Sequence, residues 1–232
     1  MPDFKEDLID SINFCKKNFD FLELTIFPGN HYQIDLLKKK LDSFPVFGHL
    51  YWENDIADSY LRNDFLGIFE EIDFLKRLGA EYITVHPSNS NKIETSKKAL
   101  NILGEHFSPL LVENSLKEPF CHIDNLMTLG LGITLDIGHL IISGGNIDDF
   151  LKTGKDNIKH FHVHGISNGK DHCAFNDPDH LSEIVKKISR YKKDFSLSLE
   201  VFLKNREDEF PSIEERRDFL LFYSREIKKG AN

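Results

Sequence analysis

Short apolar runs alternate with longer amphipathic segments along the whole chain, and this alternation limits the fold more than any other feature of the sequence. The runs are rich in Val, Ile, Leu and Phe and have the length of buried strands. The segments between them have the period of helices, as in Phe65–Leu78, and Gly79 then predicts a helix end. We predict strands at Phe21–Ile26, Phe44–Tyr51, Tyr82–His86, Leu110–Glu113, Ile133–Asp136, Ile158–His164 and Phe195–Phe202.

A strand–helix alternation of this kind predicts a parallel sheet with crossover helices. Two architectures satisfy it, a doubly wound open sheet and a closed barrel. A doubly wound nucleotide-binding domain normally carries a glycine-rich turn after its first strand, and Phe27-Pro28-Gly29-Asn30 is not such a turn. We therefore predict an α/β fold of the TIM-type (β/α) barrel class.

The predicted barrel departs from the usual pattern at its beginning. We count about seven strands, and the chain opens with a helix at roughly Lys5–Lys17, where a barrel normally opens with a strand. Either the barrel is incomplete, with about seven strands, or a short first strand is not recognisable. No linker, repeat or low-complexity segment is present, so we predict one domain over residues 1–232.

Composition narrows the class of protein. Lys and Arg total 29 and Asp and Glu 38, and the net charge of -9 disfavours a broad basic surface for nucleic acid, although a local basic patch stays compatible with it. The cysteines Cys15, Cys121 and Cys173 are scattered without CxxC spacing, which predicts reduced thiols in a cytoplasmic protein. The polar N-terminus and the lack of a long apolar run predict no membrane segment.

Six consecutive predicted strands end in a residue that can bind a metal ion. A single polar residue at a strand end is usually one that faces water, but six in succession indicate a shared function. In a parallel barrel these strand ends meet at one face, and a mixture of imidazole and carboxylate favours Zn²⁺ or Mn²⁺. A cation also explains how several carboxylates can lie together without repelling each other. The residues are His49, His86, Glu113, Asp136 followed by His139, His164, and Glu200.

Three histidines on one predicted strand have different expected roles. His160, His162 and His164 alternate, so their side chains point to the same side of the strand. His164 is nearest the carboxyl end and is the candidate ligand, whereas His162 lies a layer deeper and His160 is expected to pack or to hydrogen-bond inside the barrel. Asp171 and His172 follow in a predicted loop, where both a ligand role and a solvent-exposed position are open.

At these residues the sequence resembles the xylose-isomerase-like TIM barrel superfamily, which contains sugar isomerases and epimerases as well as abasic-site nucleases of the endonuclease IV type. The resemblance extends from Phe21 to Phe202. It rests on His49-Leu-Tyr, Leu78-Gly-Ala-Glu-Tyr-Ile-Thr-Val-His86-Pro-Ser, Leu111-Val-Glu113-Asn, Leu135-Asp136-Ile-Gly-His139, His164 and Leu199-Glu200, which occur in the order of the superfamily's strands.

The resemblance implies two sets of metal ligands. The four ligands of the epimerase branch correspond to Glu113, Asp136, His164 and Glu200. The nuclease branch binds three zinc ions through nine residues, of which eight can be matched: His49, His86, Glu113, Asp136, His139, His164, His172 and Glu200. The ninth is an aspartate two positions before the loop histidine. Here that position is Lys170, and Asp171 lies one residue out of register.

The first function that the resemblance implies is a metal-dependent sugar or sugar-phosphate isomerase or epimerase. The ion, zinc or manganese, would polarise a substrate carbonyl and favour an enediolate, while Glu113 and Glu200 would take and return a proton. The partner would be a small carbohydrate-like molecule. An aromatic residue at the rim, Phe27, Tyr51 or Trp52, would be suited to stack on a sugar.

The alternative is a zinc-dependent phosphodiesterase of the endonuclease IV type that acts on abasic-site DNA. The many histidines favour this interpretation, whereas Lys170 and the acidic net charge disfavour it. A binding protein without turnover is a third interpretation, and the intact epimerase ligand set argues against it.

Overall fold

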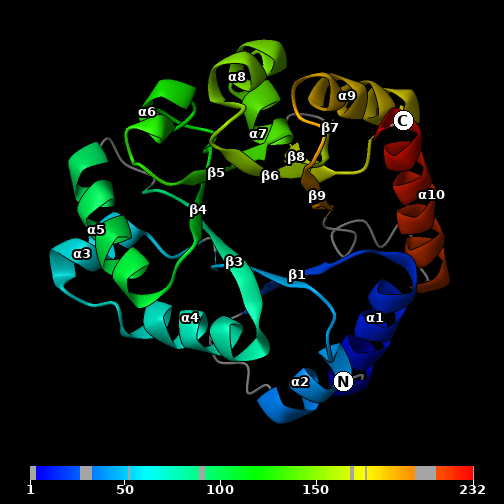
Figure 1. Cartoon of the computed structure of the whole chain (residues 1–232), viewed down its shortest axis with the longest axis horizontal. Coiled ribbons are helices and arrows are strands. Elements are labelled where there is room, and N and C mark those ends of the chain that lie inside the picture. Colours follow the sequence, from blue (N-terminus) through cyan, green and yellow to red (C-terminus); the bar gives the residue numbers. More distant parts are fainter. Residues whose placement is uncertain are drawn as a thin grey trace. The chain divides into compact units, whose positions relative to one another are not determined.

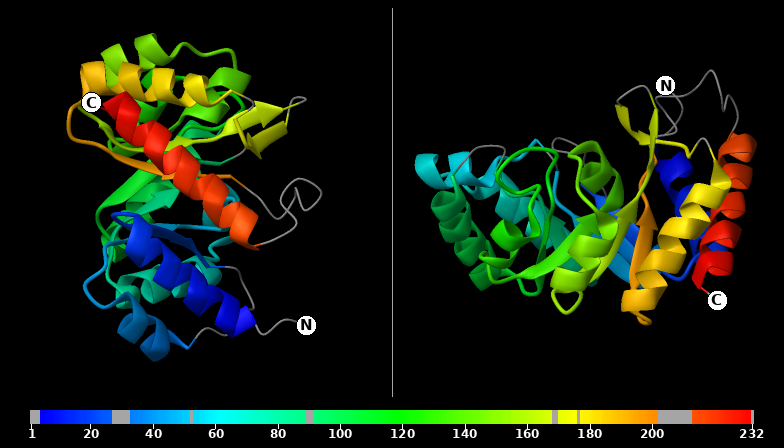
Figure 2. Two further views of the ribbon diagram at one scale, coloured as in Figure 1. Left: turned by 90° about the vertical axis from the view of Figure 1, so that its right-hand side faces the viewer. Right: turned by 90° about the horizontal axis from the view of Figure 1, so that it is seen from above.

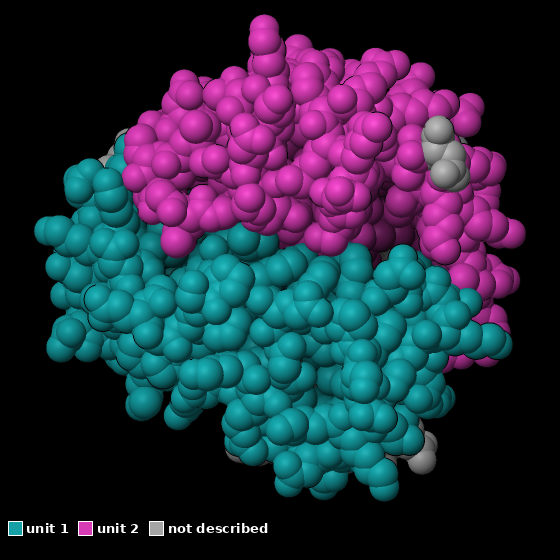
Figure 3. All heavy atoms as spheres, in the orientation of Figure 1, with its two compact units in different colours: residues 1–113 teal, residues 114–232 magenta. Residues whose placement is uncertain are grey.

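The computed structural model describes residues 4–26, 33–51, 53–88, 92–167, 170–175, 177–201 and 213–231. They belong to two compact units, residues 1–113 and residues 114–232, which Figure 3 shows in different colours.

Unit 1 contains four parallel strands in chain order. They are β1 (Leu22–Thr25), β2 (Val46–His49), β3 (Ala80–Val85) and β4 (Leu110–Glu113), and each pairs with the next. The helices are α1 (Phe4–Asn18), α2 (Ile34–Leu41), α3 (Ile56–Arg62), α4 (Leu66–Leu78) and α5 (Ile93–His106). In Figure 1, α2, α4 and α5 lie along one side of these strands. Each of these strands is preceded by a helix, because consecutive parallel strands need a crossover connection.

Close packing of α4 on β2 fixes the strand that ends in His49. The apolar face of α4 is buried, with Ile72 and Leu75 fully covered, and the helix ends at Gly79 in the left-handed conformation (φ 87°), as predicted. A Cβ added to Gly48 would lie 2.8 Å from the Leu75 side chain. A larger residue at position 48 would thus push helix and strand apart, which explains a glycine directly before a candidate ligand.

Unit 2 contains three parallel strands, β5 (Gly132–Asp136), β6 (Ile158–Val163) and β9 (Ser196–Leu199), with β6 paired to both others. Its helices are α6 (Ile123–Met127), α7 (Ile137–Ile142), α8 (Ile147–Gly154), α9 (Pro178–Tyr191) and α10 (Ile213–Ala231). Helix α10 packs along α9 (Figures 1 and 2), and Tyr223 Oη donates a hydrogen bond of 2.8 Å to the Phe175 carbonyl oxygen.

An antiparallel ribbon of two strands, β7 (Gly165–Ser167) and β8 (Lys170–Cys173), follows β6. It stands out from the parallel strands of unit 2 in both views of Figure 2. The prediction of a loop through Asp171 and His172 was therefore wrong. The polar side chains of this segment give no apolar periodicity, so the sequence does not indicate a strand here. Backbone pairing with β7, rather than an apolar face, stabilises β8.

The seven predicted strands all occur. Leu110–Glu113 has the predicted bounds, and the other strands differ from theirs by one to a few residues at one or both ends. Within the described residues the parallel strands number seven, and the chain opens with α1, as predicted. Among the helices that the structure describes, none combines the length and the apolar character needed to cross a membrane. The three cysteines are free thiols.

Candidate functional site

In unit 1, three predicted ligands converge at the ends of neighbouring strands. Glu113, the last residue of β4, has its Oε2 atom 3.0 Å from Nε2 of His49 and 3.0 Å from Nε2 of His86. His49 ends β2 and His86 follows β3 directly. Glu113 is only 1% exposed and His49 only 4%, so this carboxylate is buried against imidazoles rather than solvated.

The tautomer of His49 indicates what this cluster accommodates. Its Nδ1 donates a hydrogen bond of 2.7 Å to the Leu50 carbonyl oxygen, because a carbonyl can only accept. A neutral ring then turns the Nε2 lone pair toward the Glu113 carboxylate. Two acceptors 3.0 Å apart are unfavourable unless the ring gains a second proton or a cation lies beside them. The donor set of two nitrogens and one oxygen fits a divalent ion.

In unit 2, a second set surrounds Asp136 at the end of β5. Asp136 Oδ1 lies 3.1 Å from Nε2 of His164, and both side chains are almost completely buried. The same oxygen accepts a hydrogen bond of 2.7 Å from the His139 backbone N–H and so caps helix α7. Asn114 holds the backbone on either side: its Oδ1 accepts from Asp136 N at 2.7 Å and its Nδ2 donates to Asp136 O at 2.9 Å.

Glu200, directly after β9, completes this second set. Its Oε2 lies 3.0 Å from Nδ1 of His162, a fully buried ring on β6. Among the described residues, Glu200 Oε2 and His164 Nε2 are buried atoms that make no hydrogen bond of acceptable geometry despite these close neighbours. Buried polar atoms normally find a partner, and a carboxylate oxygen with an imidazole nitrogen is a suitable donor set for Zn²⁺ or Mn²⁺.

The electrostatics of the second set differ between its two outer histidines. Burial opposes the charge on His164, but the nearby Asp136 carboxylate, the Gly165 carbonyl and Glu200 outweigh it and raise the pKa of His164 to about 9. For His172, burial lowers the pKa from its ordinary value, and the favourable charge of Glu200 does not offset this. His172 is thus the neutral ring, whereas His164 in the metal-free protein holds a proton that an ion would displace.

This proton gives a testable pH dependence. Because the folded-state pKa of His164 is raised above 6.5, the protonated ring stabilises the metal-free fold below pH 6.5 and this stabilisation is lost as the pH rises through about 9. We expect the free energy of unfolding of the chelator-treated protein to fall over this interval and zinc affinity to rise. Denaturant unfolding and zinc titration across the interval measure both, and His164→Asn should flatten both profiles. Equal slopes in the wild type and the variant would contradict the assignment.

The structure also shows where the other predicted residues lie. His160 Nδ1 lies 2.7 Å from Ser196 Oγ and its Nε2 lies 3.0 Å from Ser198 Oγ, which matches the expected role inside the strand layer. His139 and His172 lie close enough to His164 for their ring nitrogens to fall within 4.8 Å of one another. Of the aromatic candidates, Phe27 and Trp52 lie outside the described residues.

Two residues near the site were not singled out in the sequence. Asn114 holds the backbone of Asp136 at the end of β5, and the only sequence signal for it is its place directly after Glu113. Gly138 lies under the His164 ring, and a Cβ at this position would clash with three atoms of that ring. The glycine within Asp136-Ile-Gly-His139 hinted at a close approach, but not at which ring makes it.

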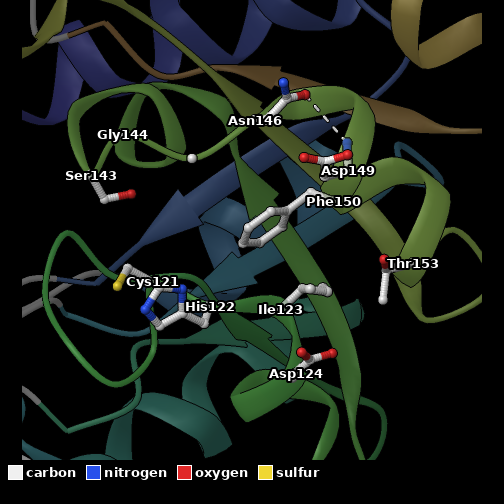
Figure 4. A pocket seen from close by; sticks show the side chains of 11 residues that line it. Cys121, His122, Ile123, Asp124, Ser143, Gly144, Asn146, Asp149, Phe150 and Thr153 are labelled. Carbon is white, nitrogen blue, oxygen red and sulfur yellow. Dashed lines mark hydrogen bonds between the residues drawn. The ribbon is translucent and has the colours of Figure 1, made fainter.

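A pocket of about 420 Å³ lies elsewhere in unit 2, between the segments that precede α6 and α8 (Figure 4). Cys121, His122, Asp149 and Phe150 are among its lining residues. No predicted ligand lines this pocket. It is therefore separate from the candidate metal centre.

Comparison with known proteins places the fold. No family model matches the sequence, and no curated protein matches it. Solved structures do match. A D-psicose 3-epimerase from Clostridium cellulolyticum H10 is 14% identical, with a TM-score of 0.68 over 95% of this chain and 94% of the other. Endonuclease IV from Thermus thermophilus is 16% identical, with a TM-score of 0.65 over 94% of each chain.

A third solved structure contains a metal. IolI protein with a bound zinc atom is 17% identical, with a TM-score of 0.60 over 98% of this chain and 91% of that one. At these identities the comparisons establish the fold alone, and they do so across almost the full length of the chain. The chain has the TIM-barrel fold of these solved structures.

Proposed function

We propose that this chain is a divalent-metal-dependent enzyme that isomerises or epimerises a small sugar or sugar phosphate by proton transfer. Its metal ligands in this proposal are Glu113, Asp136, His164 and Glu200, and the ion is Zn²⁺ or Mn²⁺. The observation that carries the proposal is the pair of buried atoms His164 Nε2 and Glu200 Oε2, which lie beside ionisable partners without making a hydrogen bond among the described residues. Such a pair suits a bound cation.

The protein groups would divide the chemistry as follows. A bound divalent ion supplies Lewis-acid polarisation of a carbonyl. Glu113 and Glu200 would remove a proton from the carbon next to that carbonyl and return one, because they are the two carboxylates at the ends of β4 and β9. Asp136 is committed to capping α7 and to His164, so it positions rather than transfers protons.

Neighbouring groups would keep the two glutamates oriented. His49 and His86 face the Glu113 carboxylate, and His162 faces that of Glu200. The first of these histidines is anchored in turn to a backbone carbonyl. A preorganised carboxylate loses less entropy when it reaches for a substrate proton.

The test is solvent-hydrogen exchange. The protein, loaded in turn with Zn²⁺ or Mn²⁺, is incubated in D₂O with a panel of ketopentoses, ketohexoses and their phosphates, and NMR follows deuterium at the carbon next to the carbonyl. We expect exchange that needs the metal and that stops after chelation and dialysis. Metal-loaded protein that exchanges no member of the panel, yet cleaves abasic-site DNA, would overturn the proposal.

The second candidate is a zinc-dependent phosphodiesterase acting on abasic-site DNA. The cluster of His49, His86 and Glu113 favours it, because two histidines and a carboxylate form a separate donor set for a further ion. Several ions that clamp the attacking and leaving oxygens are typical of phosphodiester hydrolysis. The net charge of -9 opposes it, since duplex DNA is held largely through its phosphates. The DNA-cleavage arm of the same experiment distinguishes the two.

A further inference from the structure

The turn before helix α6 gathers a carboxylate, a thiol and an imidazole that the proposed function does not use. Glu118, Cys121 and His122 each offer one ligand atom, and these three atoms lie within 4.8 Å of one another. Cys121 is buried, with 7% of the residue exposed, whereas the side chains of Glu118 and His122 are 65% and 58% exposed. A thiol that packing holds in place thus lies between two side chains that can rotate.

Hydrogen bonds and one buried aromatic ring hold this turn in shape. The Phe120 side chain is completely buried, and the Phe120 carbonyl oxygen accepts a hydrogen bond of 3.1 Å from the Ser115 N–H. Asn125 Nδ2 donates to the Pro119 carbonyl oxygen at 2.7 Å. The backbone that carries the three ligand atoms is therefore ordered before any ion binds, which reduces the entropy lost on binding.

His122 occupies a position at which a helix does not call for a histidine. It is the N-cap of α6, a position that favours Ser, Thr, Asp or Asn, yet its side chain makes no capping hydrogen bond to the described helix. Its ring turns back to Glu118 instead, with Nε2 2.6 Å from Oε1 of that carboxylate. An ionised carboxylate only accepts hydrogen bonds, so Nε2 donates in the metal-free protein. A bound ion would take the place of this proton.

The surroundings of Cys121 favour a metal ligand over a free nucleophile. Burial, together with the neighbouring Glu118 carboxylate, raises the pKa of the Cys121 thiol above its ordinary value. Without an ion the thiol therefore stays protonated at neutral pH and reacts slowly, since the thiolate is the reactive form. A divalent cation between thiol and carboxylate reverses this effect, because a thiol that coordinates a cation loses its proton.

The pocket in unit 2 lies beside this turn. Cys121 and His122 are part of its lining, and so are Ser143 and Gly144 from the segment before α8 (Figure 4). Its volume of about 420 Å³ is far larger than the roughly 30 Å³ that one water molecule occupies in the liquid. An ion held by Cys121 and His122 therefore has room beside it for a further ligand, as a tetrahedral zinc ion with three protein ligands requires.

We infer that Glu118, Cys121 and His122 bind a zinc ion at the edge of this pocket, separate from the metal centre of the proposed function. Thiolate and imidazole are ligands that suit zinc, and a carboxylate completes the set. Bonds of about 2.3 Å to sulfur and about 2.0 to 2.2 Å to nitrogen and oxygen require the ligand atoms to lie within about 4.5 Å of one another. Small rotations of the exposed Glu118 and His122 side chains reach this spacing. The fourth position is left to water or to a small molecule in the pocket.

Cobalt absorption tests the inference, because a bond between Co²⁺ and a thiolate gives a charge-transfer band in the near ultraviolet that nitrogen and oxygen ligands do not give. Bound metal is removed from the full chain with a chelator, the thiols are kept reduced, and Co²⁺ is titrated in and then displaced with Zn²⁺. We expect a band in the wild type that is absent from Cys121→Ser. Glu118→Gln and His122→Asn should each weaken Co²⁺ binding at this site at least about tenfold, since even the loss of a residue that supports a ligand has such an effect. Both of these side chains are exposed, so the two variants should keep the fold.

The other two cysteines provide matched controls, and Cys15→Ser and Cys173→Ser should both keep the band. A band that is lost in Cys173→Ser and kept in Cys121→Ser would overturn the inference, because the thiolate ligand would then lie on β8. Equal Co²⁺ affinity in the wild type, Glu118→Gln and His122→Asn would overturn it as well, since Cys121 would then bind as a single thiol. A wild type without the band would also overturn it. The proposed function would stand in each case, because its metal ligands contain no sulfur.

Discussion

Replacing Glu113 with glutamine is expected to lower the rate of metal-dependent proton exchange by roughly 10²- to 10⁴-fold, the range that a positioned acid or base contributes. Glutamine keeps the shape of glutamate but cannot take up a proton, and it removes the negative charge that faces Nε2 of His49 and Nε2 of His86 at 3.0 Å. The carboxylate is almost completely buried, so solvent cannot replace it. Deuterium incorporation into substrate, followed by NMR at saturating metal, is the measurement.

The matched control is Glu81→Gln, an exposed glutamate on the neighbouring strand β3. It should leave the exchange rate within about twofold of the wild type, as surface substitutions usually have small effects. Metal content is measured for both variants, because loss of a ligand and loss of a base both lower the rate. A Glu113→Gln protein that retains its metal and exchanges at the wild-type rate would show that Glu113 transfers no proton.

The parallel strands could be predicted from sequence because local patterns determine them. Leu110–Glu113 was predicted with the observed bounds of β4, since an apolar run between turn signals leaves little freedom. The alternation of His160, His162 and His164 predicts that the three share one side of the strand. His160 and His162 lie in β6 with ring centroids 5.1 Å apart, and His164 follows the strand directly. The histidines have different partners: His160 lies beside Ser196, whereas His164, nearer the carboxyl end, lies beside Asp136.

The ribbon was missed although a signal for it was present. Asn168-Gly169 is the dipeptide most typical of a two-residue hairpin turn, and it stands between the segments that form β7 and β8. The strands are three and four residues long and carry few apolar side chains, so no periodicity supported the turn. The polar side chains of this segment predict a loop, whereas its backbone hydrogen bonds alone make it an antiparallel ribbon.

The contacts that orient the candidate ligands could not be predicted, because they join residues distant in sequence. The two hydrogen bonds between Asn114 and Asp136 span 22 residues, and only the folded sheet brings them together. The left-handed backbone of His172 likewise arises from the ribbon and has no local sequence cause, since glycine or asparagine would be the usual residue there. The sequence thus indicates the candidate ligands, but not the hydrogen bonds and backbone conformations that orient them.

Gly138→Ala is expected to lower metal affinity by roughly 10- to 100-fold, the effect typical of disturbing a residue that orients a ligand. Gly138 lies in α7, and its backbone allows the His164 ring to lie directly against the helix. A methyl group would occupy the position of the ring atoms Cε1, Nε2 and Nδ1, so His164 or the helix would have to move. Either movement separates His164 Nε2 from Asp136 Oδ1, which now lie 3.1 Å apart. Zinc calorimetry and the exchange assay measure the loss.

The comparison with Gly67→Ala separates this steric effect from a general effect of alanine. Gly67 is an exposed glycine within α4 where an added Cβ would meet no atom within 4 Å. Alanine at that position should stabilise the protein by up to about 1 kcal/mol, because it favours the helix and restricts the unfolded chain. At position 138 overpacking should instead destabilise it by about 1 to 3 kcal/mol. If Gly138→Ala binds zinc as tightly as the wild type, the approach of His164 to α7 is not what shapes the metal centre, and the ligand set must be revised from His164 outward.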